Sequence, residues 1–311
     1  MAAGSKKVII AALIGNALIS VTKFAASAFT GSSAMFSEGA HSLVDTANQG
    51  LLLHGMRRAK RPASPGFPFG HGKEVYFWSF IVAILIFAAG AGVSLYEGVH
   101  GLADPHPVSN PYVNYAVLVL AMLFEGVAWY MALREFRHEK GDLGYFQAVR
   151  RGKDPTIFVV LFEDSAAMLG LVVAFTGVVL GHVTGDWRYD SYAAIAIAMI
   201  LAGTAVWLAF ETKSLLIGEG AGKDVVEEIR RRAGAAPGVE HVNEVLTLHM
   251  GPDFLLVNIS VDFADACTAD EVESAVAALD ADVKQAFPEI KRVFVEAEAR
   301  RRNIAQPHST G

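Results

Sequence analysis

The chain has 311 residues, of which 53% are hydrophobic and 19% are charged, and its mean hydropathy is +0.36. This composition is too apolar for an ordinary soluble enzyme of this length and indicates an integral membrane protein. The formal net charge of −6 argues against nucleic acid as a partner, and the single cysteine, Cys267, excludes an internal disulfide framework and a cysteine-cluster metal site.

Long apolar runs fill the first two thirds of the chain. A run of about 20 residues is enough to cross a bilayer. Six runs of this kind occur, at 8–30, 33–56, 75–99, 112–133, 157–182 and 191–210. The sequence therefore predicts an α-helical membrane protein with six transmembrane helices.

Lysine and arginine residues are distributed unevenly among the connections between these runs. They gather before the first run, between the second and third, and between the fourth and fifth, whereas the alternate connections carry almost none. By the positive-inside rule, both termini are expected in the cytoplasm. The alanine- and arginine-rich usage points to a bacterial inner membrane, with an organellar membrane left open.

After residue 210 the sequence becomes more polar, and shorter elements of soluble type are expected. They follow the order αββαβ, at 223–233, 245–249, 255–263, 268–286 and 292–297. Thr268 and Glu271 form a capping box that opens the second helix. Helices packed on one sheet give a small α+β domain.

These boundaries predict three parts of the chain. A six-helix transmembrane domain is expected at 1–213 and a cytoplasmic domain at 214–299. The last residues, 300–311, are expected to form a disordered tail.

The second run contains the stretch SEGAHSLVDTANQG, which begins at residue 37. Its polar residues Glu38, His41, Asp45 and Asn48 are spaced three, four and three apart, so they stack on one face of a helix. A charged group at membrane depth costs several kcal/mol unless it is paired, hydrated or bound to an ion. A binding function is therefore the leading hypothesis, and hydrogen bonding that only holds the helices together is the alternative.

The fifth run supplies two further carboxyls, Glu163 and Asp164, in VVLFEDSAAMLG. Neighbours on a helix point about 100° apart, so both are not expected to bind one ion equally. Asp164 is the expected ligand beside His41 and Asp45. An imidazole nitrogen with carboxylate oxygens suits Zn²⁺, Co²⁺ or Fe²⁺ and leaves Mn²⁺ possible.

These features together resemble the cation diffusion facilitator family. The resemblance rests on six apolar runs, the His-x-x-x-Asp of His41 and Asp45, GHGKE at residues 70–74, and the C-terminal αββαβ pattern. The LFEDSAA of the fifth run is most similar to the branch that includes the mammalian zinc transporter nine type. The resemblance implies a ferredoxin-like cytoplasmic domain, a homodimer that meets through it, and export of a divalent metal in exchange for protons.

The chain departs from the family pattern at several positions. Many members carry a His or Asp one turn before the aspartate of the fifth run, where this chain has Val160. Asn48, Glu163 or water is left to fill that position. Of the ligands that some members gather in the loop after the second run, His71 remains, and a structural role is expected for it.

The cytoplasmic domain also differs from metal-sensing members of the family. The positions that would hold metal there are Asn243, Phe294 and Glu296 in this chain. We therefore expect this domain mainly to dimerise.

The function expected from these residues is alternating access around His41, Asp45 and Asp164, with the metal as substrate and no separate cofactor. A membrane sensor or assembly partner that does not transport is the alternative. An enzyme is not expected, because the sequence has no His-Glu-x-x-His and no nucleophile with a placed base.

Lys23 and Glu125 are further ionisable residues within the runs. Lys23 is expected to extend toward a membrane interface. Glu125 lies in the middle of the fourth run, where a role in carrying protons is a secondary hypothesis.

Overall fold

The computed structural model describes residues 3–104, 107–141, 144–145, 148–149 and 154–300. These residues divide into two compact units. The first comprises the described residues of Met1–Lys60 and Glu74–Lys213, and the second those of Arg61–Lys73 and Ser214–Gly311. The expected disordered tail at 300–311 lies, except for its first residue, outside the described residues.

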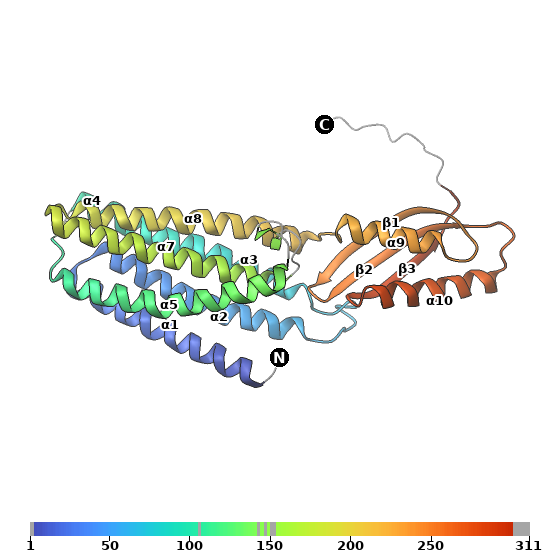
Figure 1. Cartoon of the computed structure of the whole chain (residues 1–311), viewed down its shortest axis with the longest axis horizontal. Helices are drawn as coiled ribbons and strands as arrows, with labels where there is room; N and C mark the ends of the chain where they lie inside the picture. The colour runs from blue at the N-terminus through green and yellow to red at the C-terminus, as the bar shows by residue number, and fades with distance from the viewer. Residues whose placement is uncertain (1–2, 105–106, 142–143, 146–147, 150–153, 301–311) are drawn as a thin grey trace, which may run out of the picture. The chain divides into compact units, whose positions relative to one another are not determined.

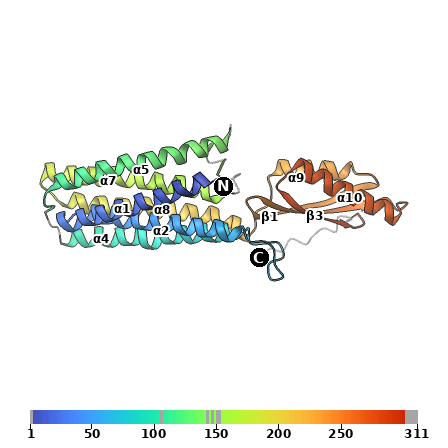
Figure 2. The same cartoon turned by 90° about the horizontal axis from the view of Figure 1, so that it is seen from below.

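The first unit is a bundle of long helices that lie side by side (Figures 1 and 2). They are α1 (Ala3–Thr30), α2 (Ser33–Ala59), α3 (Glu74–Leu85), the π-helical turn η1 (Ile86–Ala91), α4 (Gly92–Ala103), α5 (Pro111–Lys140), α7 (Pro155–Thr184) and α8 (Arg188–Ile217). Each of the six expected runs forms a helical segment here. The third is interrupted by η1, which the hydropathy pattern does not predict.

Four helical segments are long and apolar enough to cross a membrane, judged by length and composition. They are Glu74–Ala103, Pro111–His138, Phe158–Thr184 and Arg188–Ile217. Helix α2 is long enough but not apolar enough, because the polar side chains of Glu38, His41 and Asp45 lie along it. Four crossings are therefore supported, and six remain a prediction.

Local sequence signals explain where α2 and α7 begin and where α7 ends. Ser32 caps α2, since its side chain accepts a hydrogen bond from the Met35 backbone N–H at 3.1 Å. Asp154 caps α7 in the same way through Thr156, and Pro155 occupies the first helical position. Gly185 ends α7 with a φ of +74°, a conformation that favours glycine.

The second unit contains α9 (Lys223–Gly234), β1 (Val239–Gly251), β2 (Phe254–Phe263), α10 (Ala269–Ala286) and β3 (Ile290–Ala297). This order confirms the predicted αββαβ pattern. The sheet has the order β1-β2-β3, in which β1 pairs with β2 antiparallel and β2 with β3 parallel. The first strand is longer than the predicted 245–249, because its pairing with β2 continues across two bulges as far as Val239.

Both helices of this unit cover the same face of the sheet (Figure 2). Ile229 of α9 and Leu279 and Val283 of α10 pack there against the buried side of β2. The predicted capping box of Thr268 and Glu271 is confirmed at the start of α10.

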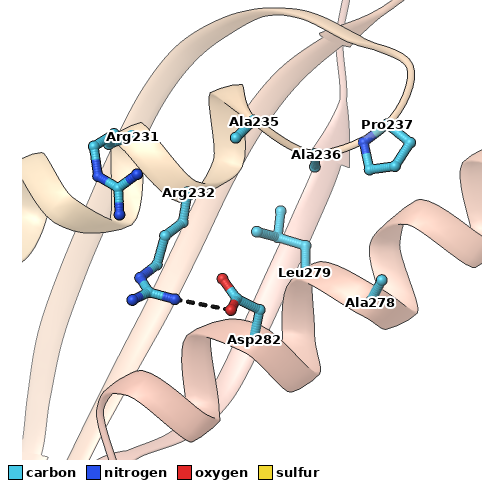
Figure 3. Close-up of a pocket in the computed structure, with 8 residues that line it drawn as sticks. All are labelled: Arg231, Arg232, Ala235, Ala236, Pro237, Ala278, Leu279 and Asp282. Atoms are coloured by element: carbon cyan, nitrogen blue, oxygen red, sulfur yellow. Dashed lines mark hydrogen bonds and ion pairs between the residues drawn. The ribbon is translucent and has the colours of Figure 1, made fainter.

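A shallow pocket lies between the end of α9 and the middle of α10 (Figure 3). At its edge Arg232 bonds Asp282 at 2.8 Å, and Glu228 bonds both Arg231 and Arg232. These pairs lower the pKa of the Glu228 carboxyl to about 2, chiefly through the hydrogen bond from Arg231. The group is fully exposed, so the pairs orient the helices more than they stabilise them.

Candidate metal site

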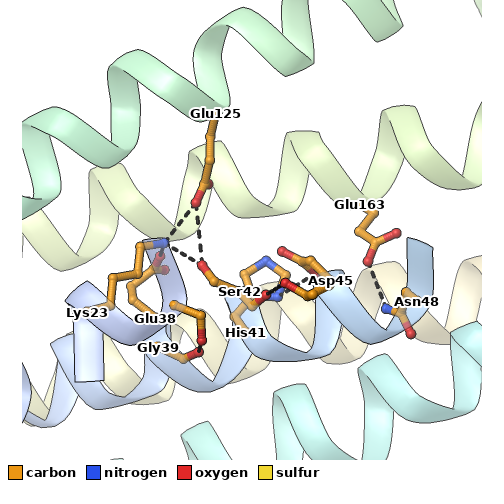
Figure 4. Close-up of polar contacts among 11 residues, drawn as sticks. Lys23, Glu38, Gly39, His41, Ser42, Asp45, Asn48, Glu125 and Glu163 are labelled. Atoms are coloured by element: carbon orange, nitrogen blue, oxygen red, sulfur yellow. Dashed lines mark hydrogen bonds and ion pairs between the residues drawn. The ribbon is translucent and has the colours of Figure 1, made fainter. Parts of the chain in front are cut away.

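The polar residues of α2 form one buried face within the bundle, as their spacing predicts. Glu38, His41 and Asn48 are at most 1% exposed and Asp45 is 8% exposed. The His41 Nδ1 lies 3.2 Å from the Asp45 Oδ1, one helical turn away. An imidazole and a carboxylate therefore lie together in the interior of the first unit (Figure 4).

Helix α7 packs against α2 and brings a second carboxyl to this face. The Asn48 amide nitrogen donates a hydrogen bond to the Glu163 Oε1 at 2.7 Å (Figure 4). Among the described residues, the hydrogen bonds from this part of α7 to α2 run through Glu163 rather than the neighbouring Asp164. Glu163 is thus the α7 carboxyl that faces α2 in this conformation.

In this conformation the side chains are not gathered around one point. Among the described residues, no three His, Cys, Asp or Glu side chains lie close enough to hold a metal ion together. Val160, one turn before Asp164, supplies no donor atom. A single ion would require the α2 and α7 side chains to move toward each other.

Several buried nitrogen and oxygen atoms on α2 have no hydrogen-bond partner among the described residues, and some of them belong to the candidate site. In the described part of the chain, the His41 Nε2 and the Asn48 Oδ1 are buried without a hydrogen-bond partner. A buried polar atom without a partner costs about 1–3 kcal/mol. Nitrogen and oxygen atoms of this kind, beside carboxylates, are suitable ligands for a borderline divalent cation.

Lys23 lies in a different place from the one expected. Instead of reaching an interface, it is fully buried, and its Nζ bonds Glu38 at 3.0 Å, Ser42 at 2.8 Å and Glu125 at 2.9 Å (Figure 4). The prediction was wrong because two carboxylates on other helices satisfy the ammonium within the bundle. The mid-span carboxyl of Glu125 was the signal that could have revealed a buried partner.

A further buried carboxyl, that of Asp190 at the start of α8, was missed by the sequence analysis. Its Oδ1 accepts a hydrogen bond from the Ser32 hydroxyl at 2.6 Å, and its Oδ2 accepts one from the Ala34 backbone N–H at 3.2 Å. Asp190 therefore binds the N-terminus of α2, which carries the candidate site.

The secondary candidate positions make other contacts. The His71 ring stacks on Phe67 at 4.3 Å between centroids, which fits the structural role expected for it. Asn243 bonds the Ser260 hydroxyl at 3.2 Å, and Glu296 bonds Asn258 at 3.1 Å.

Comparison with known proteins identifies the family to which the helical unit is similar. The family model for the cation efflux transmembrane domain matches residues 9–217. The proton-coupled zinc antiporter SLC30A9, mitochondrial, of Xenopus laevis is 35% identical over 84% of this chain and 47% of its own length. Metal tolerance protein C4 of Arabidopsis thaliana is 28% identical over 83% of this chain and 57% of its own length.

The chain spans about half the length of these curated relatives. Among solved structures, the nickel form of a MamM CTD variant covers 25% of this chain and 99% of its own, at 24% identity and a TM-score of 0.24. The expected bacterial inner membrane has no support in the relatives' names, since the SLC30A9 proteins are called mitochondrial. The match over residues 9–217 and the 35% identity show that the chain belongs to the cation efflux, or cation diffusion facilitator, family of membrane transporters, near its zinc transporter nine branch.

Proposed function

We propose that this protein moves a divalent transition-metal cation across a membrane in exchange for protons. Zinc is the expected ion, with Co²⁺, Fe²⁺ and Mn²⁺ as possible substrates. Membership of the cation efflux family supports transport, and the relative named as a proton-coupled zinc antiporter supports the choice of ion and of exchange. Homodimer formation through the second unit is part of this proposal.

The observation that carries the proposal is the buried face of α2 opposite Glu163. His41 and Asp45 supply an imidazole nitrogen and a carboxylate there, and Asn48 holds Glu163 toward them. We propose that the ion is bound by His41, Asp45 and an α7 carboxyl, with Asn48 positioning that carboxyl. Glu163 is favoured by its contacts in this conformation, and Asp164 is brought in by a rotation of α7.

Proton exchange follows from the cost of burying these groups. Ligands must be deprotonated to bind a metal, so the incoming ion displaces protons. After the ion leaves, bare carboxylates at membrane depth would cost several kcal/mol, and protons replace the ion during the return. Alternating access around one site then couples metal in one direction to protons in the other.

Uptake of Zn²⁺ into proteoliposomes under an imposed pH gradient tests this proposal. We expect saturable flux, reduced by competing Co²⁺, Fe²⁺ or Mn²⁺, abolished in Asp45→Ala and Glu163→Ala proteins, and lowered less in Asp164→Ala. Glu135→Ala, which changes an exposed carboxyl on α5, is the control. Unchanged flux in Asp45→Ala and Glu163→Ala would defeat the assignment, and metal binding without flux would favour a sensor or assembly role.

A further inference from the structure

The buried cluster around Lys23 joins three helices. Lys23 comes from α1, Glu38 and Ser42 from successive turns of α2, and Glu125 from α5 (Figure 4). A lysine ammonium has three N–H donors and no acceptor. Its three bonds, of 2.8 to 3.0 Å, use all of them. The ammonium therefore has no further N–H with which to donate a second hydrogen bond to either carboxyl.

Unlike the ammonium, both carboxyls of the cluster have hydrogen-bonding capacity that is not used. In each carboxyl, one oxygen accepts a hydrogen bond from Lys23. Within the described part of the chain, the other oxygens, Glu38 Oε1 and Glu125 Oε2, are buried without a hydrogen-bond partner. Glu38 Oε1 lies against α7, where a Cβ added at Gly170 would come within 2.5 Å of it. An ionised carboxylate needs donors on both oxygens, and here each has donors on only one.

The charges of the cluster do not cancel if both carboxyls are ionised. One ammonium and two carboxylates leave one negative charge in the bilayer interior, which costs several kcal/mol. Among the described residues, the other ionisable groups that interact with the cluster are His41 and Asp45 on α2 and Asp164 on α7. Two of these three are acids, and the third is positive only when protonated, so they bring no permanent positive charge.

We propose that Glu38 and Glu125 hold one proton between them, which makes this cluster a buried proton-binding site separate from the metal residues. The proton removes the uncompensated charge and occupies one of the two unpartnered oxygens. The evidence for this site is the set of contacts among α1, α2 and α5, and it does not depend on the transport proposal. If the protein does exchange metal for protons, the site gives that exchange a proton carrier beside the metal ligands.

Infrared spectroscopy of the purified full chain at neutral pH, with a chelator present, tests this proposal. A protonated carboxyl absorbs as a carboxylic-acid C=O stretch, separate from the carboxylate bands. We expect Glu38→Gln and Glu125→Gln each to lose the same acid absorption, because the carboxyl left in either variant pairs with Lys23 and ionises. Glu135→Gln, an exposed carboxyl on the same helix as Glu125, is expected to leave that absorption unchanged.

Lys23→Met provides an independent measurement. Without the ammonium, both carboxyls are expected to carry protons, so the acid absorption should increase. If neither glutamine variant loses acid absorption, both carboxyls are ionised in the native protein and the proposal is wrong. An acid absorption that does not increase in a folded Lys23→Met protein would also overturn the proposal. If Lys23→Met does not fold, the glutamine variants alone test the proposal.

Discussion

The Asn48 side chain distinguishes between the two adjacent carboxyls of α7. Its amide donates a hydrogen bond to Glu163 at 2.7 Å, and no hydrogen bond joins it to Asp164 among the described residues. Glu163 is 3% exposed and Asp164 is less completely buried. The two carboxyls therefore have different roles in this conformation, although they are neighbours in the sequence.

Replacing each carboxyl by its amide separates these roles. We expect Glu163→Gln to weaken Zn²⁺ binding about 10–100-fold, because it removes the anionic oxygen that faces α2, and Asp164→Asn to weaken it less. Isothermal titration of the purified protein measures both affinities. A larger loss in Asp164→Asn would mean that α7 binds the ion in a rotated position and that Asp164 is the ligand, as the sequence alone suggested.

Residue spacing along one helix was enough to predict the buried polar face of α2. The intervals between His41, Asp45 and Asn48 place them on one face whatever surrounds the helix. The rotation of α7 depends on packing against α2, which no local pattern reveals, so the choice between Glu163 and Asp164 could not be made. The Lys23 prediction failed for the same reason, because its partner Glu125 lies 102 residues away.

At the scale of whole elements, α2 begins with a cap that comes partly from another helix. Ser32 caps α2 locally, and Asp190 of α8 accepts from both the Ser32 hydroxyl and the Ala34 backbone N–H. A carboxylate is favoured at a helix N-terminus by the backbone N–H groups that point toward it. Asp190 therefore fixes the position of α2 relative to α8.

Removing this interhelical cap is expected to loosen the start of α2. Asp190→Ala should cost about 1–3 kcal/mol, because it leaves buried donors without an acceptor. Hydrogen exchange of the full chain, read at the first turn of α2, measures the loss of protection. The control is Asp186→Ala, because Asp186 is exposed and its side chain accepts a hydrogen bond from the nearby Arg188 backbone N–H. Equal protection of α2 in both variants would contradict the role given to Asp190.

The π-helical turn η1 lies beside the candidate site. The third segment runs antiparallel to α2, since Gly55 contacts Trp78 near one end and Ser33 bonds Glu97 near the other. η1, at Ile86–Ala91, therefore lies next to the middle of α2, which contains His41 and Asp45. Hydropathy detects the length of this segment but not a change in its hydrogen-bonding pattern, so the sequence predicts one uninterrupted helix. π-Turns occur often at functional sites, which agrees with this placement.

At the scale of the whole molecule, the connection between α2 and α3 belongs to the second unit. Residues Arg61–Lys73 group with the C-terminal domain rather than with the helices they join. The backbone of Gly72 lies against the end of β1, where a Cβ added at Gly72 would overlap the Met250 carbonyl oxygen and lie 3.1 Å from the Gly251 Cα. The loop that follows the site-bearing helix is thus held against the small sheet.

A methyl group at this contact should separate the loop from the sheet. Gly72→Ala places the Cβ against backbone atoms, which cannot rotate away, so we expect a loss of about 1–3 kcal/mol from the second unit. Gly66→Ala changes the same loop at a position with nothing within 4 Å of the added Cβ, and it should alter stability by less than about 0.5 kcal/mol. Thermal unfolding of the two full-length variants compares them, and flux assays on the same proteins show whether the contact also affects transport. If the loop only connects two helices, the two variants will unfold together and carry metal equally; if it links the domain to the transport helices, Gly72→Ala alone will reduce both stability and flux.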